Sequence, residues 1–464
     1  MFIKGSIATL IFFSILTTLP VIHAKPLSIS HDNLDIKIGQ AIFEKLWVFA
    51  PSSTKSSDGL GPLYNARSCH QCHDLSKKDL TPIPSSLVIH ISIEPNSVNT
   101  DEKTKENLKL LGFIPEPSYG KQIQTLAYPG AKAEAEVSVS HQSVSITFPD
   151  GEQLHLSKPN YIITNPGYGD FHEALKSSPR IAPRMIGLNW LEAIPVDILL
   201  NNADPKDVDN DGISGKVNWV WDLITQTSQV GRFGWKASKP SLDQQNLAAL
   251  STDIGVSSWL FPKAEGDCSE RQSHCTQLAR STETHLVNIQ DNKSSNNHLM
   301  VEASKEMTDL LLRFTASLAQ QKPLPKSNNE LTEFESAQRL FNTIGCQSCH
   351  ISNYEDIVNT YTNDKIPATI SPFTDLLLHD MGEALADGRK EFNASGNEWR
   401  TAPLWGIAEY LKKSSNPLFL HDGRANSVLE AILWHGGEAE KSKQAFMKLS
   451  KDKRLTLIHF VESL

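Results

Sequence analysis

Two short segments combine a pair of cysteines with a histidine in a spacing suited to a cofactor. The copies are Cys69-His70-Gln71-Cys72-His73 and Cys346-Gln347-Ser348-Cys349-His350, whereas a chain of this composition should contain such a motif by chance about 0.003 times. Two thiols three positions apart can reach the two vinyl groups of one haem, and the adjacent histidine then lies under the iron. The sequence therefore predicts two covalently bound c-type haems, with attachment through Cys69, Cys72, Cys346 and Cys349 and iron ligation by His73 and His350.

Two other kinds of cysteine site suit these motifs less well. A zinc knuckle needs four clustered ligands, and a thioredoxin-type dithiol has no use for the trailing histidine. The third cysteine pair, Cys268 and Cys275, lies in a polar stretch and is predicted to form a disulfide. The alternative is a redox-active dithiol, for which the nearby Arg271 and His274 are the visible groups that could lower a thiol pKa.

The first 24 residues have the pattern of a secretory signal. Lys4 supplies a positive charge, residues 7–19 are apolar, and cleavage is expected after Ala24. The alternative is that this segment stays uncleaved as a membrane anchor. After it, no segment approaches 18 uninterrupted apolar residues. We therefore expect a periplasmic protein without a stable membrane span after cleavage, in a compartment that permits disulfides.

The composition excludes several classes of protein. The chain has 464 residues, of which 39% are hydrophobic and 21% charged, values typical of a folded protein with two or three domains. The formal net charge is −9, which disfavours an electrostatic interaction with nucleic acid.

Periodicity predicts helices next to the motifs and strands between them. Helices are expected at residues 38–48, 300–318 and 451–464, and before the second motif, where Thr332 and Glu335 form a capping box. Alternating stretches at 87–93, 136–140, 144–148 and 154–156, with a turn at 149–151, predict small β-hairpins. The predicted fold is mainly α, with two cytochrome c-like domains at 25–325 and 331–464 joined by a linker at 320–329, and with β-hairpin and calcium-loop insertions in the first.

An acidic loop lies between the motifs. Asp207, Asp209 and Asp211 occupy positions 1, 3 and 5 before Gly212, which suits Ca²⁺. The twelfth position is Asn218 rather than glutamate, so the loop is not a standard EF-hand, and a solvated acidic turn is the alternative. Three tryptophans follow that could relay electrons or pack in the core: Trp219, Trp221 and Trp235.

Seven further segments resemble one known family, the bacterial di-haem oxidoreductases, whose members are named peroxidases or thiol oxidoreductases. The segments are 59–69, 178–180, 191–195, 231–236, 376–382, 398–401 and 420–424. The C-terminal part is also similar to di-haem cytochrome c peroxidases and related tryptophan-modifying enzymes. The resemblance covers most of the mature chain and implies an oxidoreductase with two haems. Related enzymes hold Ca²⁺ between their haems.

The resemblance also suggests a sixth ligand for the C-terminal haem. In these relatives a His-Asp-Gly turn precedes a helix that supplies the ligand, and the corresponding residue here is His435. The alternatives are a helix-end histidine without iron, or ligation by Met381 or His379, while His421 is expected to be a turn residue. For the N-terminal haem no sixth ligand is predicted, since a lone Met185 or His90 is more often core or surface.

An open iron would suit peroxide chemistry, in which a nearby base moves a proton and the second haem supplies an electron. Related peroxidases carry a distal glutamate, which makes Glu192, and then Glu134, the candidates, with an exposed or capping carboxylate as the alternative. The leading expectation is peroxide reduction at the His73 haem, with a small redox protein as electron partner. A non-catalytic electron carrier and a redox-linked binding module are the alternatives.

Overall fold

The computed structural model describes residues 33–54, 57–73, 84, 86–99, 101–279, 301–318, 328–361 and 367–464. The predicted signal at 1–24 and most of the predicted linker, 320–327, lie outside the described residues. Within the described part, no helix is both long enough and apolar enough to span a membrane.

The prediction of a mainly α fold is wrong. The structure is 33% helix and 21% strand, with the strands distributed over many small sheets, so its class is mixed. The C-terminal part, predicted to be a helical cytochrome domain, contains two two-stranded sheets. Strands of three to five residues leave too short a pattern for periodicity to reveal them.

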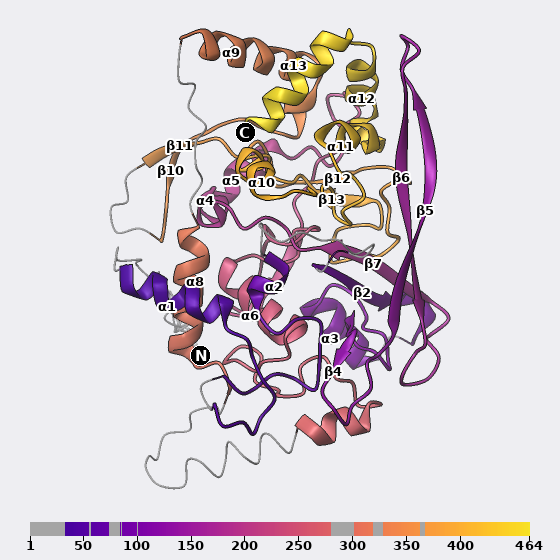
Figure 1. Ribbon diagram of the computed structural model, residues 1–464, viewed down its shortest axis with the longest axis vertical. Coiled ribbons are helices and arrows are strands. Elements are labelled where there is room, and N and C mark those ends of the chain that lie inside the picture. The colour runs from indigo at the N-terminus through magenta and orange to yellow at the C-terminus, as the bar shows by residue number, and fades with distance from the viewer. Residues whose placement is uncertain are drawn as a thin grey trace, which may run out of the picture.

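The α-helices are α1 (Asn33–Glu44), α2 (Cys69–His73), α3 (Glu102–Leu110), α4 (Leu188–Ala193), α5 (Val196–Asn202), α6 (Leu242–Asp253), α8 (Lys305–Ser317), α9 (Asn328–Thr343), α10 (Ile407–Lys413), α11 (Val428–Trp434), α12 (Glu440–Met447) and α13 (Lys451–Glu462). Helices α9, α13 and α12 lie at the top of the molecule in Figure 1, α1 and α8 at the left, and α2 and α6 near the centre. Short 3₁₀ helices are η1 (Pro95–Ser97), η2 (Cys346–Ser348) and η3 (Gly437–Ala439).

All strand pairs in the described sheets are antiparallel. The central sheet has the order β3-β2-β7 and places His90 opposite both Gln122 and Ser178. The strands are β1 (Leu63–Tyr64), β2 (Leu87–Ile93), β3 (Gln122–Ile123), β4 (Leu126–Ala127), β5 (Glu136–Thr147), β6 (Gln153–Thr164), β7 (Leu175–Ile181), β8 (Trp219–Asp222), β9 (Thr227–Val230), β10 (Tyr354–Val358), β11 (Pro367–Ile370), β12 (Leu378–Asp380) and β13 (Glu398–Arg400).

One long hairpin replaces the predicted small ones. Strands β5 and β6 pair over 12 residues each around the predicted turn, and the hairpin runs along one side of the molecule, at the right in Figure 1. At its tip Phe148 and Leu156 are buried in a core that otherwise consists of C-terminal residues. Arg454 of α13 donates hydrogen bonds to Asp150 and Glu152 beside the turn.

Several local predictions are confirmed, but two helix bounds are wrong, the first because α1 spans Asn33–Glu44 where a helix at 38–48 was predicted. Helix α8, helix α13 and strand β2 lie where periodicity placed them, and Cys268 and Cys275 form the expected disulfide. Helix α9 already begins at Asn328, so Thr332 lies inside it rather than capping it. A capping box is a local pattern that also occurs inside helices, so it did not mark the start of α9.

Candidate haem sites

The first motif forms helix α2, and a distant carbonyl fixes the orientation of its histidine. His73 Nδ1 lies 3.1 Å from the carbonyl oxygen of Pro183, which follows β7. A hydrogen bond from Nδ1 to a carbonyl is the usual support of a metal-ligating imidazole, because it leaves Nε2 free as the ligand. Burial lowers the pKa of His73 to about 4, so the ring is neutral at pH 7 and able to ligate iron.

The second motif repeats this arrangement on a different local structure. Cys346 begins the 3₁₀ helix η2 after Gly345, whose φ of 91° suits glycine. His350 Nδ1 lies 2.9 Å from the carbonyl oxygen of Phe373, and burial lowers the pKa of His350 to about 4. Both motif histidines are therefore neutral and held through Nδ1.

One cavity of about 550 Å³ joins the two motifs, and all six motif cysteines and histidines line it. None of the four motif cysteines is in a disulfide, and burial raises the pKa of Cys69 and of Cys346 to about 12. Such thiols are not thiolates at pH 7, which disfavours both a zinc knuckle and a reactive dithiol. A large, mainly apolar cavity between paired thiols and neutral, oriented imidazoles fits haem.

His435, the predicted sixth ligand of the C-terminal haem, lines the cavity near His350. It follows helix α11, lines the cavity, and is close enough to His350 that its charge lowers the pKa of His350. Its Nδ1 lies 2.7 Å from the carbonyl oxygen of Ala431, so this imidazole too is held through Nδ1. His350, His435 and the rival candidate Met381 all line the cavity, and ligation by His435 stays a prediction.

The geometry at His379 disfavours iron ligation. Its Nε2 lies 2.9 Å from Asp375 Oδ2 and its Nδ1 lies 2.7 Å from Glu438 Oε2, so neither nitrogen is free. His379, Asp375 and Cys349 lie close enough together to hold a metal ion, but the two carboxylates already occupy the imidazole.

His421 is a buried residue of a turn, as predicted. Its ring stacks on Trp399 with centroids 3.7 Å apart and 12° between the planes. Its backbone carbonyl accepts a hydrogen bond from Ile181 N, which joins the turn to strand β7.

The two candidate ligands for the N-terminal haem are differently placed. Met185 lies two residues after Pro183, whose carbonyl contacts His73 Nδ1, and it packs against the cluster of Phe43, Leu311 and Phe314, as Cys69 does. His90 lines the cavity from β2, and burial lowers its pKa well below the usual value. No described contact places either residue opposite His73.

The predicted glutamates lie away from the cavity lining and have other partners. Glu192 accepts hydrogen bonds from Leu242 N and Tyr361 Oη, both at 2.9 Å. Glu134 accepts from Gln124 N and Gln272 Nε2 and is fully buried. Both carboxylates therefore have the surroundings of structural residues, and their catalytic role stays a prediction that the geometry does not favour.

Another carboxylate does line the cavity beside the first motif. Asp253, the last residue of α6, accepts a hydrogen bond from Gln122 Nε2 at 2.9 Å, and its charge raises the pKa of Cys69. Burial raises the pKa of Asp253 to about 6, and the Oε1 atom of the cavity-lining Gln122 is buried without a partner in the described structure. No sequence motif marks Asp253, because the contacts come from β3 and α2, far away in the chain.

The acidic loop has the predicted arrangement. Ligand oxygens of Asp207, Asp209 and Asp211 lie within 4.8 Å of one another, and their carboxylates accept hydrogen bonds from backbone amides of the same loop. Lys441 Nζ donates a hydrogen bond to the carbonyl of Asp211, so a cation from α12 also touches the loop.

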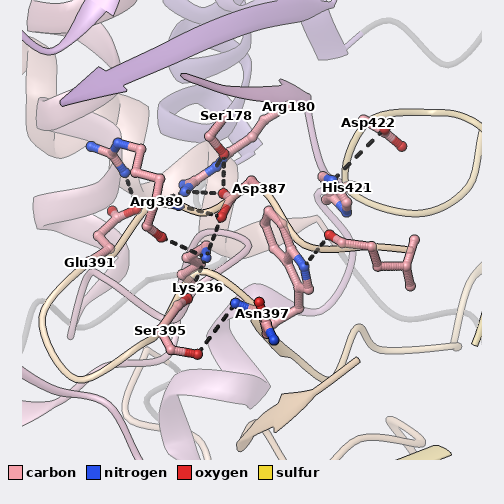
Figure 2. A network of polar contacts seen from close by, with 12 residues as sticks. Ser178, Arg180, Lys236, Asp387, Arg389, Glu391, Ser395, Asn397, His421 and Asp422 are labelled. Atoms are coloured by element: carbon pink, nitrogen blue, oxygen red, sulfur yellow. Dashed lines mark hydrogen bonds and ion pairs between the residues drawn. The ribbon is translucent and has the colours of Figure 1, made fainter. Parts of the chain in front are cut away.

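A charged network connects the N-terminal and C-terminal parts next to the cavity (Figure 2). Asp387 accepts from Lys236 Nζ at 2.9 Å, and Glu391 accepts from Arg180 at 2.8 Å and from Arg389 at 2.7 Å. Lys236 also lies 4.4 Å from the centre of the Trp399 ring.

Two of the tryptophans at this junction face the cavity. Trp235 and Trp399 line it, whereas Trp219 is 43% exposed on β8 and Trp221 packs under Lys109. Of the three tryptophans singled out in the sequence, Trp235 is therefore the one placed between the motifs.

Two oriented histidines on one shared cavity define a protein with two haem sites. Comparison with family models agrees, since residues 24–464 match the family described as "Di-haem oxidoreductase, putative peroxidase". The chain belongs to this di-haem oxidoreductase family. Neither the curated proteins nor the solved structures gave a significant match.

Proposed function

We propose that this protein is a periplasmic c-type cytochrome of the peroxidase type, which reduces peroxide at the His73 haem and takes in electrons through the His350 haem. The observation that carries the proposal is the asymmetry of the two sites. His435 is close enough to His350 to lower its pKa and would supply a second ligand there, whereas no described contact joins Met185 or His90 to His73. An open position at one iron and a closed one at the other would separate catalysis from electron entry.

Covalent attachment would follow from the motif cysteines. Haem supplies the redox-active iron, to which peroxide oxygen can bind when a coordination position is open. The chain would fix each haem through two thioethers and one imidazole, from Cys69, Cys72 and His73 at one site and from Cys346, Cys349 and His350 at the other. Burial would keep both imidazoles neutral, and the Pro183 and Phe373 carbonyls would orient them.

Asp253 would accept the proton of the bound peroxide, and Gln122 would orient the substrate. A base works best when its pKa is near the working pH, and the Asp253 pKa of about 6 meets this condition better than an exposed aspartate. The unpartnered Gln122 Oε1 can accept a hydrogen bond from an O–H group, which would orient the substrate.

Electrons would cross between the sites through aromatic side chains. Trp235 and Trp399 line the cavity that both motifs share, and their Nε1 atoms donate to the carbonyls of Ile181 and Leu385. The Asp207 loop would bind Ca²⁺ and thereby fix the backbone that leads to Ser214. Ser214 donates a hydrogen bond to Glu438, which also contacts His379.

Low-temperature EPR of the oxidised and half-reduced protein, with and without hydrogen peroxide, tests the proposal. A high-spin ferric signal that peroxide consumes is expected, because the His73 iron would lack a sixth ligand. Two low-spin signals that peroxide leaves unchanged would overturn the proposal and indicate an electron carrier, with His90 or Met185 as the additional ligand.

A further inference from the structure

Four cations line the cavity without a carboxylate partner. Arg184, Arg232, Lys239 and Arg400 all line it, and among the described residues none of them forms an ion pair. They contrast with Arg180, Lys236 and Arg389 of the neighbouring network, each of which contacts Asp387 or Glu391 (Figure 2).

The hydrogen bonds of these four cations go to neutral groups. Arg184 donates to Pro403 O at 3.0 Å, Arg232 to Leu191 O at 3.0 Å, and Arg400 to the carbonyls of Gly234 and Thr401. Lys239 Nζ lies 3.5 Å from two oxygens of Ser238, at the limit of a hydrogen bond.

Uncompensated charge is unfavourable at such positions. Arg232 and Arg400 are only 6% and 7% exposed, and burial lowers the pKa of all four groups. A buried cation without a counter-charge is strongly destabilising unless an anion is bound beside it.

The other charges around the cavity do not supply that anion. The charge of Glu391 raises the pKa of Lys239, but Glu391 is already paired with Arg180 and Arg389. Glu192 is near Arg232, but it is bonded to Leu242 and Tyr361. Asp375 faces Arg400 and is shared with His379.

We propose that Arg184, Arg232, Lys239 and Arg400 bind the propionate groups of the two haems. The inference rests on the proposed di-haem function. Each haem carries two propionates, so two haems bring as many carboxylates as the cavity has unpaired cations. Arg184 directly follows Pro183, whose carbonyl contacts His73. Arg400 directly precedes Thr401, whose carbonyl accepts a hydrogen bond from Thr374. Thr374 in turn follows Phe373, whose carbonyl contacts His350.

Reduction potentials of the holoprotein test the assignment. In Arg184→Gln and Arg400→Gln, loss of a positive charge next to a propionate should favour the ferric state and lower one haem potential. We expect at least a tenfold change in the ferric to ferrous ratio at fixed potential, which corresponds to about 59 mV. Arg184→Lys and Arg400→Lys keep the charge and should recover most of the shift, and Arg339→Gln, an exposed cation paired with Glu335, serves as the control.

Haem stoichiometry separates the two ways in which the idea can fail. Two covalent haems with unchanged potentials in Arg184→Gln, Arg400→Gln and Lys239→Gln would overturn the propionate assignment while leaving the di-haem protein intact. Absence of covalent haem from the wild-type protein would instead overturn the proposed function. A potential that becomes dependent on pH in a glutamine variant would support the assignment, because a propionate without its cation takes up a proton near neutral pH.

Discussion

Replacement of Asp253 by asparagine removes a cavity-lining carboxylate at almost constant size. Burial raises the pKa of this aspartate from 3.8 to about 6, so ionising it in the folded protein costs about 3 kcal/mol at about 1.36 kcal/mol per pKa unit. Below pH 3.8 the side chain is protonated in both the folded and the unfolded states. Between pH 3.8 and 6 the folded protein binds more protons than the unfolded chain, so the free energy of unfolding falls as the pH rises.

The variant should lack this loss of stability. At pH 7 to 8 we expect Asp253→Asn to raise the free energy of unfolding by up to about 3 kcal/mol, with no difference at pH 3.5. Chemical denaturation of the holoprotein across this pH range measures the effect. Equal free energies of unfolding for both proteins at pH 8 would show that ionising Asp253 does not destabilise the folded protein.

Whereas Asp253→Asn should increase stability, it should decrease the rate of peroxide turnover. If Asp253 moves the peroxide proton, kcat/KM of the wild-type protein rises through pH 6, and the variant loses this dependence and about 10²- to 10⁴-fold in rate. Asp243→Asn is the matched control, because burial raises the pKa of Asp243 to about 6 on the same helix without placing it in the cavity lining. A variant at Asp253 with the wild-type pH profile and rate would refute our assignment of the proton acceptor.

Three further variants test the remaining sites. Cys349→Ala should reduce covalent haem from two per chain to about one, measured as a pyridine haemochrome, and retention of two haems would disprove the motif assignment. His435→Ala should convert one low-spin EPR signal to high spin, while Met381→Leu should not, and the reverse result would make Met381 the ligand. Asp209→Asn should weaken Ca²⁺ binding about tenfold in calorimetry, whereas calcium binding that is absent from the wild-type protein would show a solvated turn.

Local chemistry was visible in the sequence because its parts are close together in the chain. The Cys-x-x-Cys-His spacing places two thiols and one imidazole on a single turn, and the Asp207 loop carries its oxygens within five residues. Strand β2 and helix α13 were predictable for a similar reason, since the apolar residues of each lie close together in the chain.

The residues that orient His73 and contact Asp253 could not be predicted from the sequence, because they come from segments far away in the chain. The carbonyl that holds His73 lies 110 residues away, and Gln122, the partner of Asp253, is separated from it by 131 residues. Strand β5 was divided into two because the central residues 141–143 are polar and exposed, which interrupts the alternation. The class was wrong because the short strands β12 and β13 pair through tertiary contacts rather than through a repeating pattern.

The tip of the long β5–β6 hairpin can be buried only after the C-terminal part of the chain has been synthesised. Its turn finds its ion-pair partner on α13 only after about 300 more residues have been made, since Asp150 and Arg454 are 304 positions apart. Until then the apolar side chains of Phe148 and Leu156 have no core to enter. A chain that ends before α13 would therefore expose this tip to proteases and to other chains, and neither half should be expressed alone as a stable fragment.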